Sequence, residues 1–584
     1  MFTSKLMQIT FVHSPIVEYG QNYGTLFSPM WAYTLAAYVP SDWTIEITDC
    51  IFQDPKSIGE ADVFAFSGIN QDIDAIRKTY NVIRQIHPEA IYILGGPITW
   101  SMEQEGKLQS LEFFDHVFIL DGEQTLPDFL NTVSEGRAGS ADKIIRANRF
   151  AMDQALPLRF DLYRERAGSY YGGLIETSRG CPFLCEFCDI RVLPGNNRAN
   201  NKNIELIVRE LDEYFKLGIT QFQFVCDNFI GDVSWARQTV DAIIEWKEKT
   251  GATISIFTWL TINLCNYPDL MEKMRRAGFS ILFIGIESVN ENSILETAKA
   301  QNKMNMESAV VAIQSFGFII APGFIFGFDS DTDTIFDDTI KFLDQAGVIG
   351  GDPSFLTALP GTPLMSRMKR TDRLIEADGA TVREKISTNI KYLQDKDMLV
   401  EGFLNFIQEY TSANFQYSRY KNHINRIIES GNFLPSEDSG YGSPVEYLKQ
   451  QICDKNNRRM LALRLLYLVY NPTRIWAVLK AWLLTKKMTR KGYKLDINFN
   501  YWVYVWTNIG LKYWKLKATD FKIESVDDGF DLNKLLEDSD EILESTIDTR
   551  KRGDVKSSQQ ARYTNQALTN LIEERASETS NDIN

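Results

Sequence analysis

Three cysteines within eight residues constrain this chain more than any other feature. Residues 181–188 read CPFLCEFC, so the three thiols follow a CxxxCxxC spacing on one short loop. Such a loop can hold three irons of a cubane [4Fe–4S] cluster and leave the fourth iron without a protein ligand. The alternative is that the three cysteines are unrelated structural residues or belong to a zinc site. However, the sequence has no further CxxC or HxxxH pair to complete a zinc site. We therefore predict an iron–sulfur loop with one open iron, which can bind a small molecule.

Length, charge and the other cysteines define the class of protein. The chain has 584 residues, of which 44% are hydrophobic, and a net charge of −15. This length suggests about three to four globular domains, and the acidic charge argues against general nucleic-acid binding. The remaining cysteines are isolated and form no disulfide framework, so we expect a reducing compartment; they are Cys50, Cys226, Cys265 and Cys453. The N-terminus lacks the apolar core and cleavage site of a signal peptide, which predicts a cytoplasmic protein.

Residues 1–145 alternate short apolar runs with amphipathic stretches, as in a Rossmann-like open α/β sheet. The predicted strands are Gln8–Val12, Thr44–Thr48, Val63–Ser67, Ile91–Leu94 and Val117–Leu120, and the predicted helices lie near Trp31–Tyr38, Ile73–Ile86 and Gln124–Val133. Small residues or glycines end or follow three of these strands: Ser67, Gly95 with Gly96, and Gly122 with Glu123. Because ligands of such sheets bind where the strands end, we predict cofactor contacts there. A flavodoxin-like domain without a ligand is the alternative.

A charged segment at 146–170 is predicted to be a linker, and residues 171–374 form the next predicted domain. Strands spaced by roughly 30 residues each fit one βα unit. The six predicted strands are Gly173–Glu176, Phe222–Cys226, Ile254–Trp259, Ile281–Ile286, Phe324–Phe328 and Ser354–Ala358, and a helix is expected from Ile204 to Phe215. We predict a partial (β/α)6 TIM-type barrel, whose chemistry lies at the carboxyl-terminal ends of the strands.

Polar residues and glycines lie at the ends of the later barrel strands. They are Asp227 and Asn228 after the second strand, Glu287 and Ser288 after the fourth, and Gly323, Ile325 and Gly327 along the fifth. Each polar residue by itself could be a helix cap. Since the cysteine loop follows the first strand, all of them are expected at the same end of the barrel, where they predict a binding site.

These motifs resemble those of the radical S-adenosylmethionine (SAM) superfamily, and more narrowly its members with an N-terminal cobalamin-binding domain. The segment TALPGTPL at 357–364 resembles the closing segment of the hopanoid-methylase-like branch, and the likeness covers about Ser4 to Leu374. The resemblance implies that Cys181, Cys185 and Cys188 hold the catalytic cluster and that Phe187 lies against the adenine. It also implies nucleotide contacts for Asp227, Asn228, Glu287, Ser288, Gly323, Ile325 and Gly327.

The N-terminal domain resembles a cobalamin module through the turns at Gly95-Gly96 and Gly122-Glu123. It lacks the Asp-x-His-x-x-Gly motif that gives cobalt a histidine ligand. His13 follows the first strand, but Phe11 stands where that motif has aspartate, so we interpret His13 as a structural residue. The resemblance therefore implies cobalamin without a histidine axial ligand, or a module that has lost the cofactor.

The resemblance implies that SAM is cleaved reductively at the cluster to a deoxyadenosyl radical, and that an unactivated carbon is then methylated with cobalamin. A radical oxidoreductase or cyclase without cobalamin is one alternative, and a non-catalytic cluster or corrinoid redox sensor is another. The implied partners are a small, hydrophobic substrate and an electron donor such as ferredoxin or flavodoxin. Only four histidines occur, which disfavours a hydrolase built on a Ser-His or Cys-His pair.

The composition of the C-terminal third differs from that of the predicted barrel and changes again near residue 520. Residues 375–519 are predicted to be helical, and basic residues with interleaved tryptophans dominate from Lys455 to Lys517. That stretch fits either a helical subdomain packed on the barrel or peripheral contact with an anionic membrane. Residues 520–584 are acidic and poor in aromatics, which predicts a disordered tail with a short helix near Leu568–Arg575.

Overall fold

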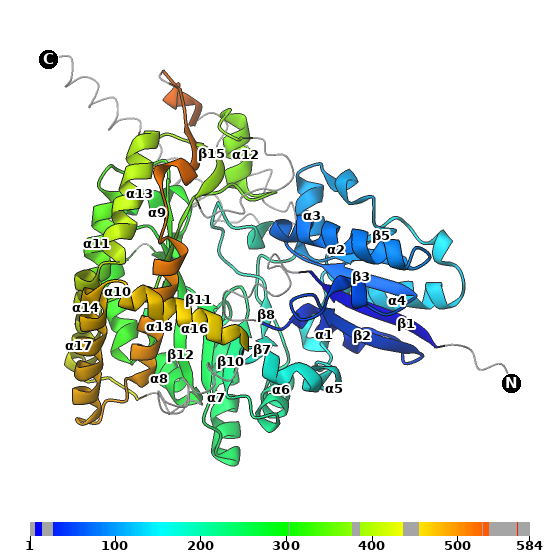
Figure 1. Ribbon diagram of the computed structural model, residues 1–584, viewed down its shortest axis with the longest axis horizontal. Coiled ribbons are helices and arrows are strands. Elements are labelled where there is room, and N and C mark those ends of the chain that lie inside the picture. Colours follow the sequence, from blue (N-terminus) through cyan, green and yellow to red (C-terminus); the bar gives the residue numbers. More distant parts are fainter. Residues whose placement is uncertain are drawn as a thin grey trace. The chain divides into compact units, whose positions relative to one another are not determined.

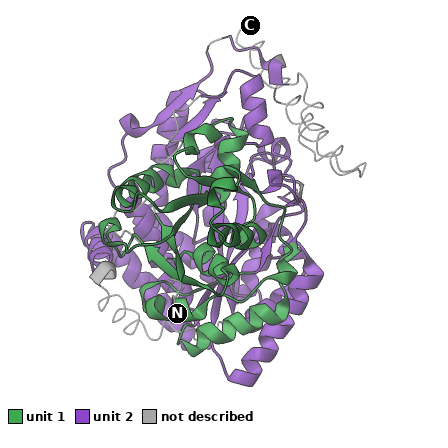
Figure 2. Ribbon diagram, turned by 90° about the vertical axis from the view of Figure 1, so that its right-hand side faces the viewer, with its two compact units in different colours: residues 1–176, 200–219, 377–383 green, residues 177–199, 220–376, 384–584 purple. Residues whose placement is uncertain are grey.

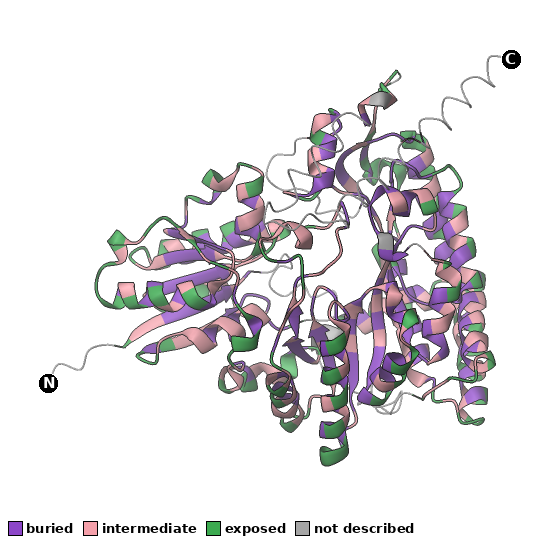
Figure 3. Ribbon diagram, turned by 180° about the vertical axis from the view of Figure 1, so that it is seen from behind, coloured by how far each residue is buried: buried purple, intermediate pink, exposed green. Residues whose placement is uncertain are grey.

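The computed structural model describes residues 6–14, 27–302, 304–375, 386–435, 455–527, 529–535, 569 and 571. The chain divides into two compact units (Figure 2). One comprises residues 1–176, 200–219 and 377–383, and the other residues 177–199, 220–376 and 384–584. In both units more than half of the strand residues are buried, and buried residues are purple in Figure 3. The five segments predicted from the sequence divide the chain differently, and their boundaries stay predictions.

The first unit is built on a six-stranded parallel sheet with the order β2-β1-β3-β4-β5-β6 (Figure 1). Its strands are β1 (Met7–His13), β2 (Trp43–Asp49), β3 (Val63–Ser67), β4 (Ile91–Gly95), β5 (His116–Ile119) and β6 (Ile144–Arg146). Its helices are α1 (Met30–Leu35), α2 (Ile73–Ile86), α3 (Pro97–Gln104) and α4 (Gly122–Ser134). The predicted Rossmann-like sheet is thus confirmed. Its strand order reverses between β1 and β3, where open α/β sheets bind ligands.

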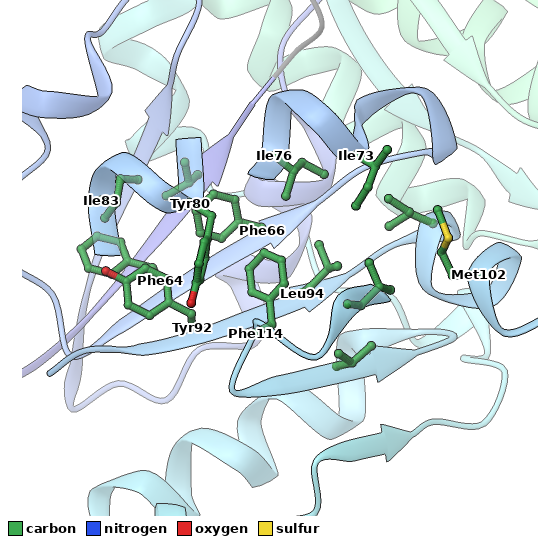
Figure 4. Packing of buried hydrophobic residues seen from close by; sticks show 14 of the residues in the cluster. Phe64, Phe66, Ile73, Ile76, Tyr80, Ile83, Tyr92, Leu94, Met102 and Phe114 are labelled. Atoms are coloured by element: carbon green, nitrogen blue, oxygen red, sulfur yellow. The ribbon is translucent and has the colours of Figure 1, made fainter. Parts of the chain in front are cut away.

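Hydrophobic side chains are buried on both faces of this sheet. Within β3, Phe64 and Phe66 point into one cluster, and Val63 and Ala65 point into the other. Figure 4 shows the first cluster, in which rings from β3, α2 and β4 pack together with Phe114. Burial on both faces explains why these strands read as continuous apolar runs rather than as alternating ones.

The predicted linker is largely ordered. It holds α5 (Phe160–Tyr163) and leads into β7 (Gly173–Glu176), which matches the first predicted barrel strand. The helix expected near 204–215 is α6 (Ile204–Lys216), and the Asn203 side chain caps its start by accepting from the N–H of Glu205. Tyr214 of α6 donates to the Leu174 carbonyl of β7 at 3.0 Å, so this helix packs on that strand.

The second unit contains parallel strands in the order β14-β13-β12-β11-β10. They are β10 (Gln221–Val225), β11 (Ser255–Leu260), β12 (Phe279–Glu287), β13 (Ile319–Phe326) and β14 (Asp352–Phe355). The helices between and after them are α7 (Val233–Thr250), α8 (Pro268–Ala277), α9 (Glu291–Glu296), α10 (Met306–Ser315), α11 (Ile335–Gln345) and α12 (Pro363–Arg370). Thr177, which directly follows β7, donates its backbone N–H to Val225 of β10 at 2.9 Å. Each predicted barrel strand therefore has an observed counterpart.

The two faces of this sheet differ in burial. Phe324 and Phe326 of β13 are buried against the rings of Phe342 and Phe336 of α11. The residues that alternate with them, Gly323 and Ile325, are only partly buried. The helices therefore cover one face of the sheet, and the other face carries the half-buried side chains.

The C-terminal region is helical, as predicted, but it also contains strands. Its helices are α13 (Lys396–Tyr410), α14 (Ala413–Glu429), α16 (Lys455–Val469), α17 (Pro472–Thr489) and α18 (Asp496–Lys512). The strand β15 (Ser387–Tyr392) pairs in parallel with β16 (Lys522–Ser525). Order thus continues past residue 520, because β16 finds a partner distant in sequence. The described part of the predicted tail extends to residue 535; beyond it, only residues 569 and 571, within its short helix, are among the described residues.

Candidate active site

The cysteine loop is held by backbone bonds on both sides. Cys181 donates its N–H to Asn196 at 2.9 Å, and Glu186 donates its N–H to Thr297 at 2.9 Å. The loop is entered through Gly180, whose φ is +94°. A Cβ at Gly180 would come within 2.2 Å of the Arg198 carbonyl, so only glycine fits this approach.

The three thiols are free and largely enclosed. Cys181 accepts a hydrogen bond from the Asn228 amide at 3.8 Å, and Cys185 accepts one from the Gln301 amide at 3.4 Å. Burial raises the pKa of Cys181 to about 11 and places the pKa of Cys188 still higher. In the described ranges no three His, Cys, Asp or Glu side chains are gathered closely enough to hold a metal ion.

Two cations, the half-buried Arg191 and the buried Lys299, lie beside the cysteines. Burial lowers the pKa of Arg191, while Cys185 and Cys188 are among the groups that raise it. For Lys299, burial alone would lower the pKa, but Glu287 and the same two cysteines raise it above its usual value. The Lys299 ammonium also lies 6.0 Å from the centre of the Phe187 ring. A cluster held by three thiolates is negatively charged, and these cations would stabilise that charge.

Glu287 ends β12 in a strained conformation. Its φ is +66°, which is rare for a residue other than glycine, and the register between β12 and β13 shifts at this point. The side chain forms a buried ion pair with Lys299. Gly285 leaves room for it, because a Cβ at this position would clash with the Glu287 carboxylate. Strain of this kind at a strand end is typical of a functional position.

Asp227 and Asn228 lie directly after β10 and hold the cysteine loop. Asp227 accepts the N–H of Gly180 at 2.6 Å. The Asn228 amide donates to Thr261 at 3.3 Å as well as to Cys181. Their role as nucleotide contacts stays a prediction, and the observed bonds add a role in orienting the loop.

The turn after β13 is organised by the buried carboxylate of Asp331. It accepts the N–H groups of Gly327 and Phe328 at 2.9 and 3.1 Å and the hydroxyl of Ser293 at 2.6 Å. Ser288 contacts the same carboxylate at 3.5 Å. Burial raises the pKa of Asp331 to about 7. The predicted residues Ser288 and Gly327 therefore meet through an aspartate that the sequence did not single out.

A buried charge network joins the cysteine loop to the strand ends. Arg367 of α12 binds Glu186 through two parallel bonds of 2.8 and 2.9 Å. The same guanidinium binds Asp329 and contacts Glu296 at 3.1 Å. Arg373 adds bonds of 2.8 and 2.5 Å to Asp329. Burial would raise the pKa of Asp329, but Arg373 and Arg367 hold it at about 2. Burial raises the pKa of Glu296 to about 7.

In the first unit the predicted cofactor residues lie at the ends of β3, β4 and β5. Ser67 and Gly95 pair across β3 and β4. Gly96 has a φ of +86°, and a Cβ there would stand 2.3 Å from the Ser67 hydroxyl. Gly122 and the buried Glu123 begin α4. These residues occupy the strand ends at which such sheets bind ligands, and their contacts with cobalamin stay predictions.

His13 ends β1, and its Nδ1 lies 3.1 Å from the Asp49 carboxylate at the end of β2. Asp49 also accepts from the backbone of Ile51 and, at 3.0 Å, from the hydroxyl of Tyr170. This fixed position agrees with the interpretation of His13 as a structural histidine.

The donor set fits an iron–sulfur cluster that binds a small nucleotide. Three unpaired thiols lie on one loop, and Arg191 and Lys299 lie beside them. The amide oxygens of Gln301 and Asn302 are buried and accept no hydrogen bond within the described part of the chain. Such oxygens can accept from a bound ligand that carries N–H groups. Cys181, Cys185 and Cys188 would hold the cluster, and the two amides lie close to Cys185 and Glu287.

Comparison with known proteins agrees with this assignment. Residues 175–343 match the family model described as the radical SAM superfamily. An uncharacterised methyltransferase of Synechocystis is 30% identical over 373 residues, which cover 62% of this chain and 67% of the relative. The chain belongs to the radical SAM superfamily. A hopanoid C-2 methylase of Rhodopseudomonas palustris is 28% identical over 400 residues, covering 67% of this radical SAM protein and 72% of the methylase.

Solved structures share the fold of this radical SAM protein. The cobalamin-dependent SAM radical enzyme OxsB, solved with aqua-cobalamin and SAM bound, superposes with a TM-score of 0.54 at 16% identity, covering 97% of this chain and 84% of OxsB. The radical SAM methyltransferase TsrM of Kitasatospora setae gives a TM-score of 0.52 at 14% identity, over 67% of this chain and 83% of TsrM. The predicted fold class and the predicted resemblance are both confirmed.

Several residues of the site were not predicted from the sequence. Lys299, Gln301, Asp331 and Arg367 lie in stretches without a recognisable motif, and they reach the site only through the fold. One residue in the sequence pointed to a cation at this site. Glu186 lies inside the cysteine loop and is buried, and a buried carboxylate requires a cation nearby.

Proposed function

We propose that this protein is a radical SAM methyltransferase that uses a [4Fe–4S] cluster, SAM and cobalamin to methylate an unactivated carbon. The observation that carries the proposal is the cysteine loop at the strand ends of a superfamily barrel, in a chain that also has an α/β sheet with glycine turns at its strand ends. The names of the Synechocystis and Rhodopseudomonas relatives support methyl transfer. The likeness to two enzymes with cobalamin bound supports the corrinoid.

When bound, the cluster would supply the electron that splits SAM into methionine and a deoxyadenosyl radical, and cobalamin would supply methyl-transfer chemistry. The chain's own residues hold and orient the groups that react. Asp227 and Asn228 fix the loop that carries the cysteines. Glu287 and Lys299 form a buried charged pair near the cysteines, which can recognise the charged groups of SAM. No side chain is required as a general base for the radical step.

The half-buried face of the barrel sheet favours a hydrophobic substrate. Phe257 and Trp259 of β11 have ring centres 4.9 Å apart, and both side chains are partly exposed. Phe283 and Ile325 continue this apolar face on β12 and β13. Such side chains exclude water from a reactive radical and bind apolar carbon skeletons. We infer that the substrate is a small hydrophobic or lipid-like molecule.

We also propose an electron-donor partner and a location for the protein. A reduced ferredoxin or flavodoxin would supply the electron, and the enzyme would work in the cytoplasm with peripheral contact to a membrane. None of the described helices is long and apolar enough to cross a membrane.

Anaerobic purification tests this function. We expect an absorbance spectrum with cluster and corrinoid bands, and release of deoxyadenosine from SAM under a strong reductant. Cys185→Ala should abolish both the cluster bands and the release, whereas Cys265→Ala, outside the loop, should change neither. Release without any bound corrinoid would favour a radical oxidoreductase or cyclase. A stable cluster without any release would favour a redox sensor.

A further inference from the structure

The helices α16 and α17 carry an unusual concentration of exposed apolar side chains. Nine of the 17 exposed large hydrophobic residues in the described part of the chain fall between 465 and 483. We call them the α16–α17 face: Leu465, Leu466, Val469, Tyr470, Ile475, Trp476, Leu479, Trp482 and Leu483. Tyr470 is 72% exposed and Trp476 is 65% exposed. Single exposed hydrophobics need no explanation, but a group this dense marks an interaction surface.

Packing of α17 against the rest of the unit does not require this face. The opposite side of α17 carries Ala477, Ala481, Thr485 and Met488, which are buried. Three of these pack in a core with Tyr420 of α14 and Trp502 of α18. Thr485 also hydrogen-bonds Tyr420 at 2.6 Å. The inner stripe therefore anchors α17, and the outer apolar side chains contribute no core packing that would explain them.

The charged residues of the segment that carries the face are all basic. Residues 455–495 contain eleven Lys and Arg and no Asp or Glu, although the whole chain has a net charge of −15. Lys487, Arg490 and Lys491, near the end of α17, are exposed. Basic side chains beside exposed Trp and Leu are the composition of helices that lie in the surface of an anionic bilayer.

We propose that the α16–α17 face docks on an anionic lipid bilayer, with its Trp and Leu side chains among the lipids and the lysines and arginines at the headgroups. A second copy of the chain fits poorly, because two such faces would bring like charges together. Nucleic acid would use the basic residues but not the exposed Leu, Ile and Val. This docking names the surface that makes the peripheral membrane contact, which is part of the proposed function. It also gives the enzyme a lipid phase from which it can take a hydrophobic substrate.

Vesicle flotation of the full-length, cluster-loaded protein tests the docking. Vesicles of phosphatidylcholine alone are compared with vesicles that also contain phosphatidylglycerol. We expect flotation with the anionic vesicles, little with the neutral ones, and partial release by salt. The triple variant Trp476→Ser, Leu479→Ser, Leu483→Ser should bind about tenfold less, because it removes most of the inserted apolar area. The variant Lys487→Glu, Arg490→Glu, Lys491→Glu should lose its preference for anionic vesicles.

A matched control removes three exposed apolar side chains elsewhere: Ile86→Ser, Ile144→Ser, Leu156→Ser. This variant should float like the wild type. Deoxyadenosine release by every variant reports that the barrel is intact, so loss of flotation with retained release supports the docking. Failure of the wild type to float, or equal flotation of the wild type and the Trp476 triple variant, overturns it. Self-association that the triple variant abolishes, without flotation, assigns the face to a second copy instead. Flotation without release leaves the docking standing and contradicts the proposed chemistry.

Discussion

Arg367 ties the cysteine loop to the rest of the barrel. Its guanidinium forms an ion pair with Glu186, which lies between two of the predicted cluster ligands. The same buried group also pairs with Asp329 and Glu296. A planar fork with five donors can make all these bonds at once, which an ammonium group cannot. Arg367 is thus a positioning residue: it acts through Glu186 on the loop, and no contact with a cofactor is needed.

Replacement of Arg367 tests this role. Arg367→Ala leaves buried carboxylates without a partner, so we expect a loss of about 3–5 kcal/mol in stability, seen as a lower apparent Tm. Iron bound after reconstitution should also fall. Arg367→Lys keeps the charge but not the fork and should give intermediate iron content. The nearby exposed Lys369→Ala is the control and should match the wild type. Wild-type iron content in Arg367→Ala would refute the positioning role.

Among the structural elements, the turn from β4 into α3 requires glycine at one position. Gly96 has a positive φ and lies against Ser67 at the end of the neighbouring strand β3. The turn brings the backbones of the two strand ends close together. A side chain at position 96 would both strain the backbone and push the turn away from Ser67.

Gly96→Ala should therefore destabilise the first unit by about 1–3 kcal/mol. We also expect less corrinoid bound after reconstitution, because the predicted contacts at Ser67, Gly95 and Gly96 would move. Gly139→Ala is the matched control, since Gly139 has no positive φ and open space around it. Thermal unfolding and the corrinoid absorbance of both variants check the expectation. If Gly96→Ala retains full corrinoid and stability, the turn is not part of the site.

At the scale of the whole molecule, one buried histidine joins three helices of the second unit. His423 of α14 contacts the Asn498 amide of α18 at 2.9 Å and Gln314 of α10 at 3.4 Å. Burial lowers its pKa to about 4, below the value of an unfolded chain, which is about 6.5. The folded protein therefore holds this ring neutral over a range in which the unfolded chain is protonated.

This pKa predicts a loss of stability in acid. Between pH 6.5 and pH 4 the unfolded state binds more protons than the folded state, so stability falls as the pH falls. From pH 7 to pH 5 the contribution of His423 is about 2 kcal/mol. His423→Gln should lower the apparent Tm at pH 7 but show a smaller further drop at pH 5 than the wild type. An equal drop in both proteins would exclude His423 as the cause.

Local patterns were sufficient to predict most of the strands of the two large sheets. The apolar runs of β1, β3 and β4 and the 30-residue spacing of the barrel strands follow from burial of side chains within short stretches. The strands β6, β15 and β16 were not predicted. The pair β15 and β16 joins segments more than 100 residues apart, and no local pattern specifies such a partner.

A short stretch of sequence is enough to predict the chemistry of one loop, because three thiols at CxxxCxxC spacing need only eight residues to form a cluster site. The sequence also predicts the strand at which that loop begins. What surrounds the loop depends on the tertiary fold. Lys299, Gln301 and Arg367 come to the cysteines from 111 to 186 residues away in the chain, counted from Cys188 to Lys299 and from Cys181 to Arg367. Their positions depend on how the strands and helices pack, and packing is a property of the whole fold rather than of any short segment.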